Sequence, residues 1–101
     1  MAASQRLCEH ITDDLLLTAG RGDLIAFADL YDQTVTAVYR LLRGVLGDSA
    51  RTEQATERVY LQVWRMAPSH DPDRQSAYSV LMLTARRELA QSVYLELSDS
   101  A

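Results

Sequence analysis

Cysteine, histidine and paired acids are the residue types with which this chain could hold a metal or catalyse a reaction. Cys8 and His10 lie close together, but two ligands do not make a zinc site, and His70 is distant in the sequence. Asp71 and Asp73 could hold a cation, although aspartates beside prolines are more often caps and turn formers. The chain has no glycine-rich phosphate loop and no nucleophile–base signature. We therefore expect no catalytic residue, no metal, no cofactor and no enzyme activity.

The composition predicts one globular domain with an acidic surface. The 101 residues weigh 11.3 kDa, 48% of them are hydrophobic and 24% are charged, which excludes disorder and suits one modest core. The net charge is −4 and the pI is about 5.0. All 10 basic residues are arginine. Because neutralising phosphates requires a basic surface, this balance does not favour an autonomous nucleic-acid binder.

Cysteine usage and hydropathy indicate the compartment. The single cysteine, Cys8, excludes an intrachain disulfide and fits a reducing cytoplasm; we interpret it as a small, partly buried residue of the first helix. No apolar run approaches the roughly 18–20 residues of a membrane span. Residues 1–14 lack the basic-then-apolar order of a signal peptide. We expect a cytoplasmic protein that makes no membrane contact.

Glycine and proline divide the chain into four segments of helical periodicity. We predict helices over roughly residues 5–19, 23–46, 49–67 and 76–97, with a loop near 67–75. Asp23, Asp48 and Ser76 are the expected N-caps, because their side-chain oxygens can accept bonds from free backbone N–H groups. No segment alternates with period two for long enough to form a sheet. The expected fold class is all-α, a four-helix bundle formed by a single domain over 1–101.

Each predicted helix has an apolar stripe that should face the core. In chain order the stripes are Leu7, Ile11, Leu15 and Ala19; Phe27, Leu30, Tyr31, Val38, Leu41 and Val45; Ala55, Val59, Val63 and Met66; and Leu81, Ala85, Leu89, Val93 and Leu97. Tyr31 and Tyr39 are expected to help pack the second helix. On the third helix a second set lies off the stripe and should face outward: Glu53, Gln54, Glu57, Arg58 and Leu61.

Four stretches, in order and at the right spacing, resemble region 2 of the extracytoplasmic-function (ECF) bacterial sigma factors. They are GDLIAFADLYD (22–32), VYLQVWR (59–65), HDPDRQSA (70–77) and TARR (84–87). The resemblance covers roughly residues 8–95 and implies an all-α bundle that acts in transcription initiation. In that family the outer face of the third helix docks on a coiled coil of the RNA polymerase β′ subunit. The following loop and the fourth helix capture and melt the promoter −10 element as single-stranded DNA.

Carried over residue by residue, the resemblance implies two surfaces. The polymerase-binding residues would be Glu53, Gln54, Glu57, Arg58 and Leu61, and the DNA-binding residues would be His70, Arg74, Tyr78, Arg86 and Arg87. Plainer interpretations stay open beside these. The face from 53 to 61 could be an ordinary solvated helix surface, and the two arginines at 86 and 87 ordinary surface charge. Trp64 and Tyr78 could pack within the fold instead of stacking on a base or a partner.

The chain also departs from the family pattern at working positions. The family has an acid where Arg58 stands, and a cation there would repel a basic partner by about 1–3 kcal/mol in a desolvated site. The family commonly has a tryptophan where Val80 stands, and its basic run falls here on Glu88, Ser92 and Tyr94. We therefore expect weak or no intrinsic DNA affinity.

These departures motivate a rival hypothesis, a degenerate sigma-like regulator. It would bind a protein partner, such as an anti-sigma factor, RNA polymerase or another copy of itself, without melting DNA. A helical interaction module with no transcriptional role is a third interpretation. The family's region 4, a helix-turn-helix domain, has no room in 101 residues. We expect either a piece of a longer protein or a naturally shortened sigma-like protein.

Overall fold

The computed structural model describes the backbone of residues 2–99 and the side chains of residues 11–95 and 97. Within this range the chain forms α1 (Ala2–Ala19), α2 (Leu24–Leu46), α3 (Ser49–Met66), the 3₁₀ turn η1 (Ala67–Ser69) and α4 (Ala77–Asp99). The described residues contain no strand, so the prediction of an all-α bundle of four helices is confirmed. The side chains of Leu7 and Cys8, which we expected to be buried and partly buried, lie outside the described residues.

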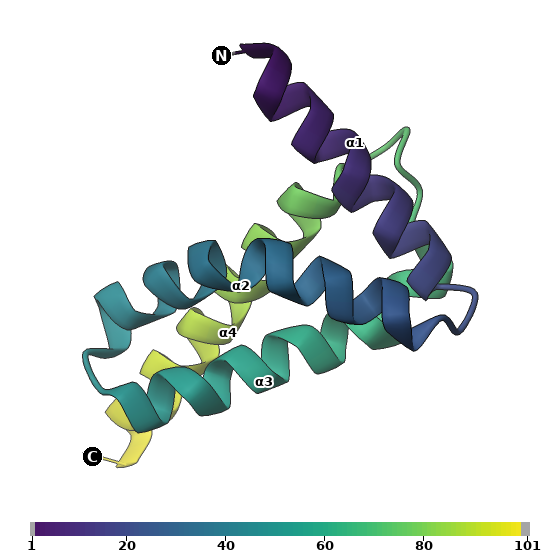
Figure 1. Cartoon of the computed structure of the whole chain (residues 1–101). Coiled ribbons are helices and arrows are strands. Elements are labelled where there is room, and N and C mark those ends of the chain that lie inside the picture. The colour runs from purple at the N-terminus through teal and green to yellow at the C-terminus, as the bar shows by residue number, and fades with distance from the viewer. Residues whose placement is uncertain (1, 100–101) are drawn as a thin grey trace.

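The helices are arranged around an antiparallel pair. α2 and α3 lie side by side, while α4 crosses behind both of them and α1 rises from one end (Figure 1). The chain links α2 to α3 through only Gly47 and Asp48. Gly47 has a φ of 72°, and its N–H donates to the Arg43 carbonyl at 3.0 Å, which ends α2 in a left-handed cap. This tight connection holds α3 beside the whole length of α2.

The predicted N-caps are confirmed. The Asp23 carboxylate accepts hydrogen bonds from the N–H groups of Ile25 and Ala26 at 3.0 and 3.1 Å, and α2 begins directly after it. Asp48 accepts from the Ala50 N–H at 3.1 Å at the start of α3. At the start of α4 the Ser76 hydroxyl accepts from the N–H of Ser79, also at 3.1 Å. Each cap satisfies backbone donors that a helix leaves free at its first turn.

The core lies where the four helices meet. Its largest fully buried side chains come from every helix and are Leu16, Val38, Leu30, Leu42, Val59, Val63, Leu81 and Thr52. The expected stripe of α3 is buried at Ala55, Val59 and Val63 and half-buried at Met66. The bundle therefore buries one stripe of α3 and leaves the opposite face of that helix in solvent.

Three predicted stripes need correction. Ile11, Tyr31, Val45, Val93 and Leu97 are exposed instead of buried, and the core takes Thr12 and Leu16 on α1 and Leu42 and Leu46 on α2. A four-residue step turns the side-chain direction by about 40° at each repeat, so a long stripe stays buried only where neighbouring helices follow it. Near the C-terminus α4 reaches the rim of the bundle (Figure 1), and its last apolar residues lose that cover.

The predicted loop after α3 is only partly a loop. Its first three residues, Ala67–Ser69, form the 3₁₀ turn η1, and irregular structure follows until α4 begins at Ala77. Pro68 at the beginning of η1 suits this turn, because proline lacks the N–H that the first helical position leaves unpaired.

Candidate functional site

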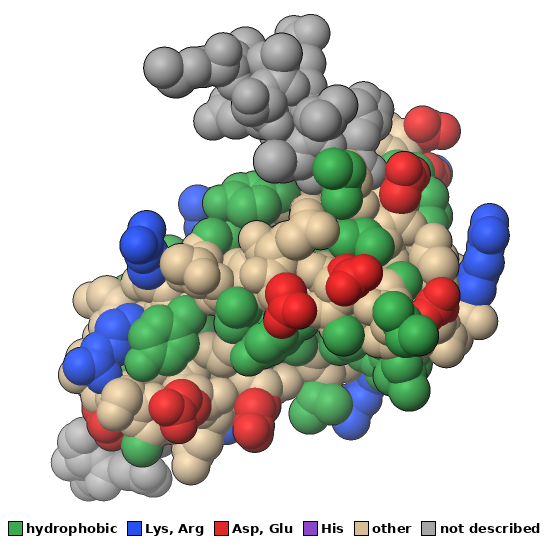
Figure 2. Space-filling view, in the orientation of Figure 1, with side chains coloured by type: hydrophobic (Ala, Val, Ile, Leu, Met, Phe, Trp, Pro, Cys, Tyr) green, Lys and Arg blue, Asp and Glu red, His purple; other side chains and the backbone are tan. Residues whose placement is uncertain are grey.

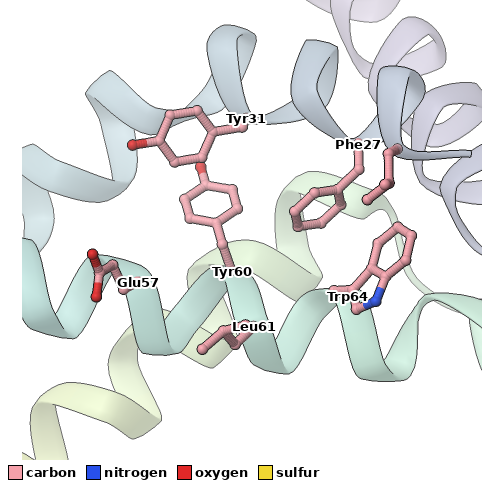
Figure 3. A pocket seen from close by; sticks show the side chains of 7 residues that line it. Phe27, Tyr31, Glu57, Tyr60, Leu61 and Trp64 are labelled. Carbon is pink, nitrogen blue, oxygen red and sulfur yellow. The ribbon is translucent and has the colours of Figure 1, made fainter.

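An open apolar groove runs along the seam between α2 and α3. Its volume is ≈ 470 Å³ and its lining consists of Leu24, Phe27, Tyr31, Glu57, Tyr60, Leu61 and Trp64. Figure 3 shows the lining side chains of α2 facing those of α3 across the groove. Glu57 is the one charged residue among them. Such a surface can bury an apolar partner and bind one cation at its edge.

Four aromatic rings build the floor of the groove. The rings of Phe27 and Trp64 meet edge to face, with centroids 5.0 Å apart and planes at 70°. Tyr31 and Tyr60 do the same at 4.7 Å and 62°, and Phe27 reaches Tyr60 at 6.3 Å. Edge-to-face pairs are each worth about 0.5–1.5 kcal/mol beyond the area that they bury. The groove is therefore preformed, because its aromatic side chains already hold one another in place.

Tyr60 is anchored beneath this floor by a buried hydrogen bond. Its hydroxyl lies 2.6 Å from the Thr34 hydroxyl, which itself donates to the Leu30 carbonyl at 2.7 Å. Since the single Thr34 proton is used in that second bond, Tyr60 is the donor in the first. Burial raises the pKa of Tyr60 to about 12, against a smaller opposite effect of the Thr34 hydrogen bond. Tyr60 therefore stays neutral at physiological pH and ties α3 to α2.

The predicted outer face of α3 is exposed at each of its five residues. They are Glu53, Gln54, Glu57, Arg58 and Leu61. Glu57 and Leu61 also line the groove, so the two features form one continuous surface, and Leu61 is 53% exposed. In Figure 2 apolar side chains follow the seam between α2 and α3, and acidic side chains lie on both sides of it. A partner with apolar and basic side chains would complement this surface.

Arg58 is paired across the bundle. Its Nε donates to Oε1 of Glu88 on α4, and Gln62 donates to the other carboxylate oxygen at 3.4 Å. The Glu88 side chain is 3% exposed and the Arg58 side chain 50%. Arg58 and Glu88, two charged residues that depart from the family pattern, therefore compensate each other. The expected repulsion between Arg58 and a basic partner is reduced accordingly.

The residues predicted to bind DNA are not all at the surface. Arg74 in the loop has an 89% exposed side chain and a weak contact of 3.8 Å with Asp71. Tyr78, Arg86 and Arg87 on α4 are also exposed. The His70 side chain, in contrast, is 1% exposed, so its ring is not presented to an external strand of DNA in this conformation.

The α4 positions that depart from the family pattern differ in exposure. Val80 is buried, Ser92 is half-buried and Tyr94 is exposed. Val80 therefore belongs to the core here and offers no ring to a DNA base. A binding role for any α4 residue stays a prediction.

Sequence reasoning missed the groove although a signal for it was present. Phe27 and Tyr31 are four residues apart on α2, and Tyr60 and Trp64 have the same spacing on α3. Two aromatic pairs at this spacing on neighbouring helices can meet edge to face. The open alternatives for Trp64 are answered in part, because it is half-buried against Phe27 and also lines the groove.

The part of the chain that the structure describes lacks two other kinds of site. It contains no group of three or more histidine, cysteine or acidic side chains placed to hold a metal ion. None of its helices combines the length and the apolar character that crossing a membrane requires.

Three of the known proteins that this chain resembles carry the same family name. No family model matches the chain. The ECF RNA polymerase sigma factor SigK of Mycolicibacterium vanbaalenii is 44% identical over 84 residues, which are 83% of this chain and 43% of the relative. The SigK proteins of Mycobacterium ulcerans and Mycobacterium bovis are each 38% identical, over 85% and 95% of this chain and 46% and 51% of the relatives. The chain thus spans about half the length of these relatives, and over that half it is similar to the ECF RNA polymerase sigma factors.

Proposed function

We propose that this chain acts in DNA-templated transcription initiation by docking on the RNA polymerase core through the groove between α2 and α3. The observation that carries the proposal is the preformed aromatic groove with exposed Leu61 and Glu57 on its α3 side. Exposed apolar side chains around a fixed aromatic floor are typical of the centre of a protein interface. The chain acts as a binding subunit in the cytoplasm and catalyses no reaction itself.

The chemistry of the groove suits a helical partner. A helix that inserts apolar side chains between α2 and α3 would cover the rings of Tyr31 and Trp64, and a basic side chain on it would reach Glu57. The coiled coil of the polymerase β′ subunit is the partner that the similarity to this family suggests. Most of the binding free energy should come from the few apolar contacts at the centre, while the acidic rim should mainly speed association.

Charge substitutions on exposed apolar residues test the docking. Leu61→Glu places a carboxylate at the groove, whereas Val45→Glu places one on an exposed part of α2 outside it, and both residues are more than half exposed. We expect Leu61→Glu to weaken binding to purified polymerase core by about 30-fold or more, the effect of losing a residue worth about 2 kcal/mol. The control should bind as the wild type does. Equal binding by both variants would refute docking through the groove.

We further propose that the loop and α4 engage promoter −10 DNA once the chain is bound to polymerase. Arg74, Arg86 and Tyr78 support this step, because exposed cations can contact phosphates and an exposed ring can stack on an unpaired base. The net charge of −4 opposes binding by the free chain, so polymerase must contribute to the complex.

Binding of a fluorescent single-stranded −10 oligonucleotide, with and without polymerase core, tests this second step. Arg74→Ala and Arg86→Ala should each weaken capture in the presence of polymerase by about 5-fold or more, and should lower its dependence on salt. Arg40→Ala, a substitution of an exposed arginine on α2, is the matched control. Wild-type affinity in all three variants would remove the DNA contact.

The buried state of Val80 and His70 favours a second candidate, a regulator that binds a protein partner without melting DNA. Neither side chain is available for a base in this conformation. An anti-sigma factor is one such partner, and polymerase core another. The same two assays separate the candidates, because a regulator would bind polymerase or an anti-sigma factor through the groove while the −10 oligonucleotide gained no affinity from either complex.

A further inference from the structure

α1 contacts both ends of the connection between α3 and α4. At the first end the chain of η1 passes so close to Gly20 that a Cβ there would lie 2.6 Å from the Ala67 carbonyl oxygen. At the other end the Asp13 carboxylate accepts a hydrogen bond from the Ala77 N–H at 2.6 Å. Gly20 directly follows the last residue of α1, and about 10 Å of helical rise separates Asp13 from it. The C-terminal part of α1, with the residue after it, therefore spans the connection, which lies beside α1 in Figure 1.

The contact with Asp13 completes the N-terminus of α4. The Ser76 hydroxyl accepts from the Ser79 N–H, and Asp13 accepts from the N–H of Ala77, which Ser76 does not reach. A carboxylate at this position also interacts favourably with the positive end of the helix dipole. α4 thus begins at Ala77 partly because a side chain from α1, 64 residues earlier in the chain, satisfies its first N–H group.

His70 lies between the two anchor points. Its side chain is 1% exposed, and its Nε2 lies 3.7 Å from the same Asp13 oxygen that binds Ala77. Among the residues whose side chains the structure describes, Nε2 has no hydrogen-bond partner. A buried polar atom without a partner is costly, and the Asp13 carboxylate lies close enough to bond Nε2 after a small movement of either side chain. The connection is therefore anchored in its middle by the burial of the His70 side chain.

We propose that α1 is a brace for the 67–77 connection and that Asp13 is its positioning residue. The brace presets the loop that carries Arg74 and the first turn of α4 that carries Tyr78. This inference rests on the proposed function, because these two residues are the ones proposed to meet −10 DNA. Asp13 need not touch the DNA; it acts by holding the backbone that presents those side chains.

Backbone hydrogen exchange tests the brace without any DNA. Asp13→Ala should increase the exchange rate at residues 70–78 by about tenfold, the effect of losing one charge-assisted hydrogen bond, and should leave α2 and α3 within twofold. Asp14→Ala, an exposed neighbour on the same helix, is the control. Asp13→Asn keeps an acceptor oxygen and should restore part of the protection, which also covers the case in which the alanine variant fails to fold. Gly20→Ala should loosen the same segment by steric contact, while Gly44→Ala, which has free space around it, should not.

The functional consequence is measured in the presence of polymerase core. Asp13→Ala should weaken capture of the −10 oligonucleotide by about 5-fold or more at unchanged affinity for polymerase, and Asp13→Asn should weaken it less. Unchanged exchange at 70–78, or an equal increase in every helix, would overturn the brace. A loosened loop with undiminished DNA capture would overturn its functional role. Failure of the wild type to capture DNA would instead count against the proposed function, and the exchange result would still decide whether the brace exists.

Discussion

Removing the guanidinium of Arg58 should destabilise the bundle more than its position on an exposed helix face suggests. In the wild type Arg58 donates to Glu88, whose side chain is 3% exposed. In Arg58→Ala the hydrogen bond that remains to that carboxylate among the described residues comes from Gln62, at the long distance of 3.4 Å. The substitution thus leaves a buried negative charge with one weak hydrogen bond, between two helices that form the centre of the fold.

The expected cost follows from the burial of the two partners. Breaking a fully buried ion pair by removing one member costs about 3–5 kcal/mol. Half of the Arg58 side chain is in solvent, so water can approach its vacated position and screen the charge. We therefore expect Arg58→Ala to lower the free energy of unfolding by about 2 kcal/mol. For a domain of this size that is a shift of roughly 10 °C in the thermal midpoint.

Urea unfolding followed by helical circular dichroism measures this cost, and a double-mutant cycle assigns it to the pair. Arg58→Ala, Glu88→Ala and the double variant should give a coupling energy of about 1–2 kcal/mol. Arg40→Ala is the control for losing an exposed arginine from a helix. Replacing both partners by apolar residues, Arg58→Met with Glu88→Leu, should be neutral or stabilising, because no charge is then left buried. Arg58→Glu would be a poor test of docking on polymerase, because it would place a second carboxylate beside that of Glu88.

Two results would refute this reasoning. The first is a cost for Arg58→Ala equal to that of Arg40→Ala, which would mean that the carboxylate is fully solvated in solution. The second is a coupling energy near zero, which would mean that Glu88 is stabilised by groups other than Arg58. Either result would also restore the expected repulsion between Arg58 and a basic partner.

Three further predictions concern stability. Raising the pH from about 10 to 12 should lower the free energy of unfolding by about 2 kcal/mol, because the unfolded chain ionises Tyr60 near 10.0 while burial raises its pKa to about 12 in the fold. Tyr60→Phe should abolish this loss. The prediction is contradicted if urea unfolding shows that the wild type and Tyr60→Phe lose the same free energy of unfolding over this pH range. Gly44→Ala should stabilise the interior of α2 by about 0.5–1 kcal/mol, measured by thermal unfolding, since nothing lies within 4 Å of the added Cβ; a lower midpoint would disagree. Asp48→Ala should cost about 1 kcal/mol in urea unfolding, because α3 loses its cap bond, whereas the exposed mid-helix change Asp32→Ala should cost much less.

Local chemistry explains why the helices and caps were predictable. Asp23 and Asp48 cap helices through N–H groups two or three residues away, so each contact depends on neighbours in the chain alone. The outward direction of Glu57 and Leu61 follows in the same way, because periodicity places them opposite the buried Val59 and Val63. The pattern was less reliable over long stripes, where the rotation of a helix carried Val93 and Leu97 out of the core.

By itself, then, the sequence of this protein determined its fold class, the beginnings of three helices, the exposed face of α3 and, through the quoted motifs, its similarity to the ECF sigma factors. Only the tertiary structure decided which distant residues meet. Arg58 finds Glu88 across 30 residues and Asp13 finds Ala77 across 64, and both pairings depend on how α3, α4 and α1 pack. Packing also buried His70 and left the aromatic seam of α2 and α3 open. The physical reason is that a side chain's periodicity gives its direction on its own helix, whereas its partner depends on the positions of the other helices.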